Sequence, residues 1–256
     1  MSSPKKNKWL EYGVASIILP GQKESGDLYI VKETDNQILI AVVDGLGHGS
    51  EAASAAKLAV NELDHYAHES VIALTKFCHE RLKGTRGVVI ALVAISKVDE
   101  TLTWLSIGNV EGMLLRSEPQ LNPSNPVYES IIMRPGVIGF RLPPLYASVM
   151  SISKGDLIIL STDGISDDYT YRLASDARFS YELSNTSGER TKEELLKEAE
   201  HFQHDAAYSA LKQSTEDLNI FKTGRSRKSP QELADFICKR FNKGNDDALV
   251  LVAKYL

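Results

Sequence analysis

Three apolar stretches of this chain, each long enough for a buried strand, adjoin an acidic residue where the chain must turn. The first runs directly into Asp44, the second leads through a serine and a threonine to Asp163, and the third begins just after Asp246 and its neighbour. Glycine beside such an aspartate lets backbone come close to whatever the carboxylate binds. Carboxylates at the ends of separate strands are a common way to gather hard oxygen ligands around a divalent cation. The sequence therefore predicts a metal site built from strand ends.

Taken singly, each of these aspartates has a simpler explanation, because an Asp-Gly pair most often just forms a turn. The segment Ser-Gly-Asp that ends at Asp27 adds a fourth acidic site, and this recurrence favours metal binding over isolated turns. The expected ion is Mg²⁺ or Mn²⁺, because no Cys/His cluster is available for zinc. Cys78 and Cys238 lie far apart without metal-type spacing, and we expect both to be reduced thiols.

The bulk properties of the chain limit its partners and its location. A net charge of -5 gives no reason to expect nucleic-acid binding, which normally needs a strongly basic face. No apolar stretch approaches the roughly 20 residues that a membrane span needs. The N-terminal segment 1–12 is polar and lysine-rich and lacks the apolar centre of a signal peptide. We therefore expect a cytoplasmic protein with no nucleic-acid partner and no membrane partner.

The hydrophobic periodicity predicts strands first, then two helices, more strands, and finally helices and one last strand. This order is typical of an α+β layered sandwich. Ser50 is the predicted N-cap of the first helix. We expect one domain over residues 1–256, with a helical elaboration around 170–230. The predicted strands are 14–19, 27–33, 38–43, 88–98, 101–107, 110–116, 127–133, 145–152, 156–161 and 248–255, and the predicted helices are 50–68, 71–82, 191–212 and 230–241.

Four short motifs, in this order, resemble those of the metal-dependent PPM-type serine/threonine phosphatases. They are Ser-Gly-Asp-Leu-Tyr at 25–29, Val-Asp-Gly-Leu-Gly-His-Gly at 43–49, Ser-Thr-Asp-Gly at 161–164, and Asp-Asp at 246–247 before a final apolar strand. Within that family the chain is most similar to the bacterial SpoIIE/RsbX-like branch, in which Asp-Gly-(Leu or Met)-Gly precedes an alanine-rich helix. The resemblance implies a central antiparallel β-sandwich flanked by antiparallel α-helix pairs, with a site for two divalent cations at one end.

The resemblance also implies a role for each acidic residue. Asp44 would bridge the two cations, Mn²⁺ or Mg²⁺, and Gly45 would offer its backbone carbonyl. Asp163 and Asp246 would bind one ion, and Asp27 would hold a ligand position or a metal-bound water near the other. Asp44, Asp163 and Asp246 would thereby act in catalysis through a metal-activated water.

Two features depart from the family pattern. The segment before the first motif carries Lys23 but no arginine, whereas some members have a basic residue there that holds the phosphate. Some relatives have a histidine two residues after the bridging aspartate as general acid; here that position is Leu46, and His48 lies two residues further on. His48 is a weak general-acid candidate, and an exposed residue at the helix entry is the simpler interpretation.

These observations favour a metal-dependent protein phosphatase that removes phosphate from phosphoserine or phosphothreonine on a partner. The resemblance points to a phosphorylated STAS-type antagonist or scaffold, in a bacterial stress or sigma-factor switching pathway such as a stressosome circuit. Two alternatives stay open: a pseudo-phosphatase that only docks a partner, and a hydrolase of small phosphoesters. The complete set Asp27, Asp44, Asp163 and Asp246 favours turnover over docking.

Overall fold

A computed structural model describes residues 5–6, 8–117, 127–174 and 228–256 of the chain. Its strands form two sheets, one ordered β1-β2-β12-β11-β7-β8 and the other β10-β6-β5-β4-β3, with β9 added beside β6. The strands are β1 (Lys5–Lys6), β2 (Leu10–Ile17), β3 (Asp27–Glu33), β4 (Gln37–Gly45), β5 (Val88–Ser96), β6 (Thr101–Ile107), β7 (Glu111–Leu115), β8 (Tyr128–Ser130), β9 (Met133–Arg134), β10 (Ser148–Ser151), β11 (Leu157–Ser161) and β12 (Ala248–Tyr255). The helices are α1 (Ser50–His65), α2 (Val71–Arg81) and α6 (Pro230–Phe241), and the described residues 168–174 are also helical.

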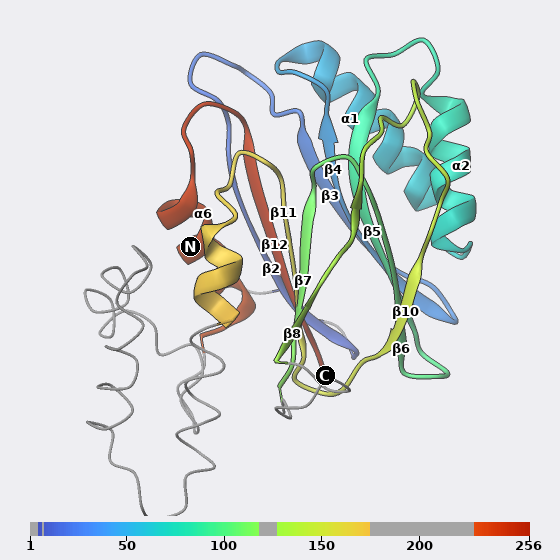
Figure 1. Ribbon diagram of the computed structural model, residues 1–256, viewed down its shortest axis with the longest axis vertical. Coiled ribbons are helices and arrows are strands. Elements are labelled where there is room, and N and C mark those ends of the chain that lie inside the picture. The colour runs from blue at the N-terminus through green and yellow to red at the C-terminus, as the bar shows by residue number, and fades with distance from the viewer. Residues whose placement is uncertain (1–4, 7, 118–126, 175–227) are drawn as a thin grey trace, which may run out of the picture.

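The two sheets pack face to face, and helices cover their outer faces (Figure 1). In β4 the even-numbered Ile38, Ile40 and Val42 belong to the core between the sheets. The odd-numbered residues of the same strand pack against α1 and α2. This division follows from the period of two along a strand, and it explains why β4 and β5 are apolar on both faces.

Sheet β1-β2-β12-β11-β7-β8 repeats this arrangement with α6 on its outer face. Leu249 and Leu251 of β12 enter the core between the sheets, whereas Val250 and Val252 pack in the cluster that contains α6. The observed α+β sandwich with helices on both outer faces confirms the predicted fold class. No helix in the described ranges is long and apolar enough to cross a membrane.

Helix α6 lies unusually close to β2 because Gly13 has no side chain. A Cβ atom at Gly13 would lie 2.2 Å from the Cα of Gln231. The Gln231 amide uses this proximity: its Oε1 accepts from the Val14 N–H at 3.1 Å and its Nε2 donates to the Val14 carbonyl at 2.9 Å. The side chain therefore satisfies backbone groups of β2 as a neighbouring strand would.

Two sequence predictions are wrong in detail. The N-cap of α1 is Gly49, with φ of 80°, and Ser50 is already helical; the left-handed φ favours glycine at the turn that starts the helix. The strand predicted at 127–133 is two short strands, because β8 pairs with β7 and β9 pairs with β6 of the other sheet. The chain crosses between the sheets here, with Ile131 buried in the core and Ile132 exposed. The helix predicted at 191–212 lies outside the described residues.

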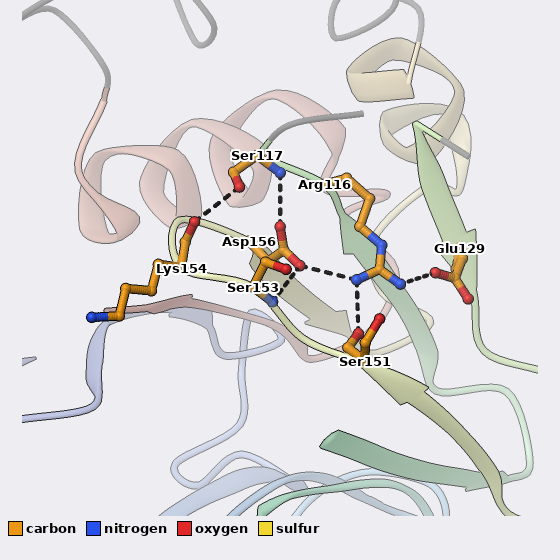
Figure 2. Close-up of polar contacts among 7 residues, drawn as sticks. All are labelled: Arg116, Ser117, Glu129, Ser151, Ser153, Lys154 and Asp156. Atoms are coloured by element: carbon orange, nitrogen blue, oxygen red, sulfur yellow. Dashed lines mark hydrogen bonds and ion pairs between the residues drawn. The ribbon is translucent and has the colours of Figure 1, made fainter. Parts of the chain in front are cut away.

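A buried ion cluster holds one end of the sandwich together. Arg116 follows β7 and donates to Asp156 Oδ2 at 3.0 Å, to the Ser151 carbonyl at 2.8 Å, and to Glu129 (Figure 2). Asp156 also accepts from the backbone N–H groups of Ser117 and Ser153. The register of β7 and β11 pairs Ser161 with Glu111 at one end and Leu157 with Leu115 at the other. The cluster therefore lies at the end opposite Asp163.

Candidate metal centre

Asp27 and Asp44 face each other across two paired strands at the end of the sandwich. The register of β3 and β4 places them directly opposite one another. Asp44 continues the inward series of Ile38, Ile40 and Val42, so its side chain points toward the other sheet. Next to it, a Cβ atom at Gly45 would lie 2.2 Å from the Ala52 carbonyl oxygen. Glycine at 45 is therefore needed for α1 to start against the strand end.

Asp163 and Asp246 approach the same end of the sandwich from the other sheet. Together with Asp44 they line a cavity of about 430 Å³. Asn109 donates from Nδ2 to Asp163 Oδ2 at 2.6 Å, which fixes the direction of that carboxylate. The Lys243 ammonium donates to the backbone carbonyl of Asp163 at 2.8 Å. The cavity is completed by Leu46, Gly47, Val89, Gly108, Asn109, Pro135, Gly136 and Val137.

The adjacent aspartates 246 and 247 do different things. Asp246 lines the cavity. Asp247 is buried, and its carboxylate accepts from the backbone N–H groups of Leu19 and Gly26, each at 2.7 Å. Asp247 thus holds the segment that leads into β3 and thereby fixes the backbone just before Asp27.

Thr162 connects Asp27 to the other sheet. Its hydroxyl donates to Asp27 Oδ2 at 2.6 Å and accepts from the Leu249 N–H at 2.9 Å. One hydroxyl therefore holds a carboxylate of β3 in place while it joins the end of β11 to β12. Leu249 contributes to this contact only through its backbone N–H.

Few interactions offset the negative charge that the carboxyl groups of the site carry when ionised. Burial, followed by repulsion from Asp27, Asp163, Asp246 and Asp247, raises the pKa of Asp44 to about 9. Burial also raises the pKa of Asp27 to about 7, against the opposing hydrogen bond from Thr162. The pKa of Asp163 is raised by burial and by Asp246. Carboxyl groups gathered in this way bind a proton or a cation strongly.

The donor set fits a hard divalent cation. Among the described residues, the Asp44 carboxylate has no hydrogen-bond partner, and it faces the other aspartates of the site. The described residues contain no group of three His, Cys, Asp or Glu side chains gathered closely enough to hold a metal ion by themselves. Mg²⁺ usually keeps several water ligands and binds proteins through one or two carboxylates. Oxygen donors around a cavity that admits water therefore suit such an ion better than a closed, all-protein cage.

Several residues of the site carried little or no signal in the sequence. Asn109 and Lys243 act on Asp163 from 54 and 80 positions away in the chain, and Thr162 reaches Asp27 across 135 positions. The turn segments around Gly108 and Pro135 line the cavity. The weak general-acid candidate His48 does not line it, and Gln22 Nε2 lies 3.2 Å from its Nδ1 at the surface.

Comparisons with known proteins agree with this architecture. The family described as Stage II sporulation protein E (SpoIIE) matches residues 34–218, well over half of the chain. The phosphoserine phosphatase RsbX of Bacillus subtilis (strain 168) is 26% identical over 167 residues, which are 64% of this chain and 79% of RsbX.

Two solved structures share the fold over nearly the whole chain. RsbX in complex with magnesium has a TM-score of 0.68 and 18% identity, and the match covers 100% of both chains. A structure from work on the bacterial stressosome, described as a modular system adapted to control secondary messenger signaling, has a TM-score of 0.66 and 24% identity, covering 96% of this chain and 99% of that one. The match to the family over residues 34–218, together with the similarity to the phosphoserine phosphatase RsbX, shows that the chain belongs to the SpoIIE family of PPM-type protein serine/threonine phosphatases.

Proposed function

We propose that the chain is a divalent-metal-dependent phosphatase that hydrolyses phosphoserine or phosphothreonine on a regulatory protein. The observation that carries the proposal is the convergence of Asp44, Asp163 and Asp246 on one cavity, with Asp27 opposite Asp44. These side chains, with the Gly45 carbonyl, would hold two ions, Mn²⁺ or Mg²⁺. When bound, the ions would activate water and offset the charge of the phosphoryl group.

The protein side chains have supporting roles in this mechanism. Asn109 orients the carboxylate of Asp163, and Thr162 orients that of Asp27. Both hydrogen bonds stabilise the ionised carboxylates and therefore favour cation binding over protonation. No described cysteine suits a covalent mechanism, because Cys78 and Cys238 are buried and burial raises the pKa of each thiol.

The similarity to RsbX and to a stressosome structure supports a partner from a bacterial stress pathway. We propose a phosphorylated STAS-type antagonist or scaffold as the substrate, and the cytoplasm as the location. We also propose that residues 1–256 form a single phosphatase domain with a helical elaboration around 170–230, most of which lies outside the described residues.

The first experiment measures hydrolysis of p-nitrophenyl phosphate with Mn²⁺, with Mg²⁺ and with EDTA. Wild type should turn over only with metal, and Asp44→Asn should lose at least about a hundredfold in kcat, because a bridging ligand is removed. Asp64→Asn is the matched control, since Asp64 pairs with Lys32 on the surface. Turnover in EDTA, or an Asp44→Asn enzyme as active as the control, would contradict the metal mechanism.

A phosphoserine peptide and a small phosphoester should then be compared at the same metal concentration. A higher kcat/KM for the peptide supports a protein phosphatase. A preference for the small ester would favour the small-molecule hydrolase, and a folded wild type inactive on both would favour a docking module.

A further inference from the structure

The loop between α2 and β5 lies beside Leu46 and Gly47, two of the residues that line the cavity. The Leu46 N–H donates to the Gly87 carbonyl at 3.1 Å, which ties this loop to the segment after β4. The Thr85 hydroxyl donates to the Leu82 carbonyl at 2.7 Å and accepts from the Gly87 N–H at 3.0 Å. Arg86 lies between Thr85 and Gly87, in a loop that hydrogen bonds hold on both sides of it.

The Arg86 guanidinium lies against the cavity wall. A Cβ atom at Gly47 would be only 2.6 Å from Arg86 Nη1, so the guanidinium occupies the space that a side chain at position 47 would fill. Gly47 itself lines the cavity and has φ of 82°. The absence of a side chain at 47 thus brings a cation to the edge of the site.

One carboxylate holds the guanidinium in this orientation. Arg86 Nε donates to Glu51 Oε2 at 2.5 Å, and Glu51 stands in the first turn of α1. Within the described ranges this is the only hydrogen bond of the Arg86 side chain, so its Nη donors remain available to a ligand. The side chain is about half exposed, at 47%, and an incoming anion can therefore reach it.

Among the described residues, the lining of the cavity offers no positively charged side chain to an anion. The described residues that line it include Asp44, Asp163 and Asp246 but no lysine or arginine. Lys243 is engaged with the Asp163 carbonyl. A phosphoryl group whose inner oxygens face the metal site still needs donors for an oxygen that faces outward. The planar, permanently charged guanidinium suits phosphate oxygens better than any other side chain.

We propose that Arg86 binds the phosphoryl group of the substrate at the mouth of the cavity, and that Glu51 positions it. This assignment rests on the proposed phosphatase function and deepens it, because it names the residue that recognises the phosphate. It places the phosphate-binding cation on the loop between α2 and β5, while the segment before the first acidic motif carries only the exposed Lys23.

The test compares Arg86→Gln with Arg81→Gln at saturating Mn²⁺. Arg81 loses the same charge near the end of α2, where it stands 3.9 Å from Glu62 and outside the cavity lining. For Arg86→Gln we expect the KM for p-nitrophenyl phosphate and the inhibition constant of inorganic phosphate each to rise about tenfold or more, since charge-assisted hydrogen bonds are lost. Arg81→Gln should stay within about twofold of wild type, and Mn²⁺ affinity should be unchanged in both variants.

Two further variants keep the test decisive. Arg86→Lys retains the positive charge but lacks the planar set of N–H donors, and it should bind phosphate with intermediate affinity. Glu51→Gln should weaken phosphate binding by a smaller factor, because the arginine keeps its charge but loses its orientation. If Arg86→Gln fails to fold, these two variants still test the assignment. Phosphate binding equal to wild type in folded Arg86 variants would overturn the assignment.

Failure of the proposed function gives a different result. In that case wild type hydrolyses no phosphoester with any metal, whatever residue stands at 86. Calorimetric titration of the Mn²⁺-loaded protein with inorganic phosphate then still tests the site. Phosphate binding that Arg86→Gln abolishes would support the subsite without the catalysis, and phosphate binding that it leaves intact would overturn the subsite.

Discussion

At the scale of single residues, the raised pKa values of Asp44 and Asp27 couple metal binding to pH. With pKa values of about 9 and about 7, these carboxyl groups of the proposed metal site would bind protons in competition with metal ions near neutral pH. We expect the dissociation constant of Mn²⁺ to fall as pH rises from 6 to about 9, with protons released on binding. Calorimetric titration in two buffers of different ionisation enthalpy measures both quantities. A dissociation constant that is independent of pH would contradict this coupling.

The same pKa shifts affect the metal-free protein in the opposite direction. Because both pKa values are higher in the folded than in the unfolded chain, the protonated carboxyl groups favour folding at acid pH. This contribution is lost as pH rises through about 7 and about 9. Metal should therefore stabilise the protein most at alkaline pH, where repulsion among the bare carboxylates is greatest. Thermal unfolding with Mn²⁺ and with EDTA across this range checks the sign.

The neighbouring residues Asp246 and Asp247 should respond differently to the same mutation. The N–H groups of Leu19 and Gly26 each bond to a different oxygen of Asp247, so Asp247→Asn replaces one of these acceptors with an NH2 group and should cost about 1–3 kcal/mol of unfolding free energy in EDTA. Asp246→Asn should leave that free energy nearly unchanged but weaken Mn²⁺ binding. Urea unfolding in EDTA and metal titration separate the two effects. Equal stability losses would show that the division of roles between the two aspartates is wrong.

At the scale of elements, the contact of α6 with β2 depends on one glycine. Gly13→Ala would place a methyl group 2.2 Å from the Gln231 Cα and push the start of the helix away from Val14. We expect a loss of about 1–3 kcal/mol from overpacking. Ser16→Ala, at an exposed position of the same strand, is the control and should change stability by less than about 0.5 kcal/mol. Urea unfolding of both variants measures the difference, and a stable Gly13→Ala protein would show that α6 can shift without cost.

Sequence periodicity located most elements but could not show how they meet. The strand predicted at 101–107 has the observed bounds, because its alternation and its flanking turns are local properties. The split of 127–133 depends on which sheet each half joins, and this is a property of the whole fold. In the site, each aspartate stood beside an apolar strand and was therefore visible. Thr162, Asn109 and Arg86 contact segments that are distant in the sequence, and no spacing between residues predicts these contacts.

At the scale of the whole molecule, one end of the sandwich carries the candidate site and the other carries a stabilising ion cluster. The aspartates of the proposed metal site occupy one end, and the buried cluster of Arg116 and Asp156 holds the other (Figure 2). Arg116→Met would leave Asp156 and Glu129 without their cation, and we expect a loss of about 3–5 kcal/mol. Because the site is at the far end, the KM for p-nitrophenyl phosphate should not change at temperatures where the variant is folded. Urea unfolding and steady-state kinetics test this, and a stability loss below about 1 kcal/mol would indicate that the pair contributes little.

The junction of Ser166 with Phe241 holds together the two chain segments that carry Asp163 and Asp246. The Ser166 N–H donates to the Phe241 carbonyl at 2.8 Å, and Ile165 forms a bridge with Asn242. Residues on both sides of the interval 175–227, among them Tyr169 and Ile237, pack in one core cluster. The closure of the sandwich at this point therefore depends on described residues on either side of the interval. Asp163 precedes the junction and Asp246 follows it, so a change confined to the interval 175–227 should leave the approach of these two aspartates intact.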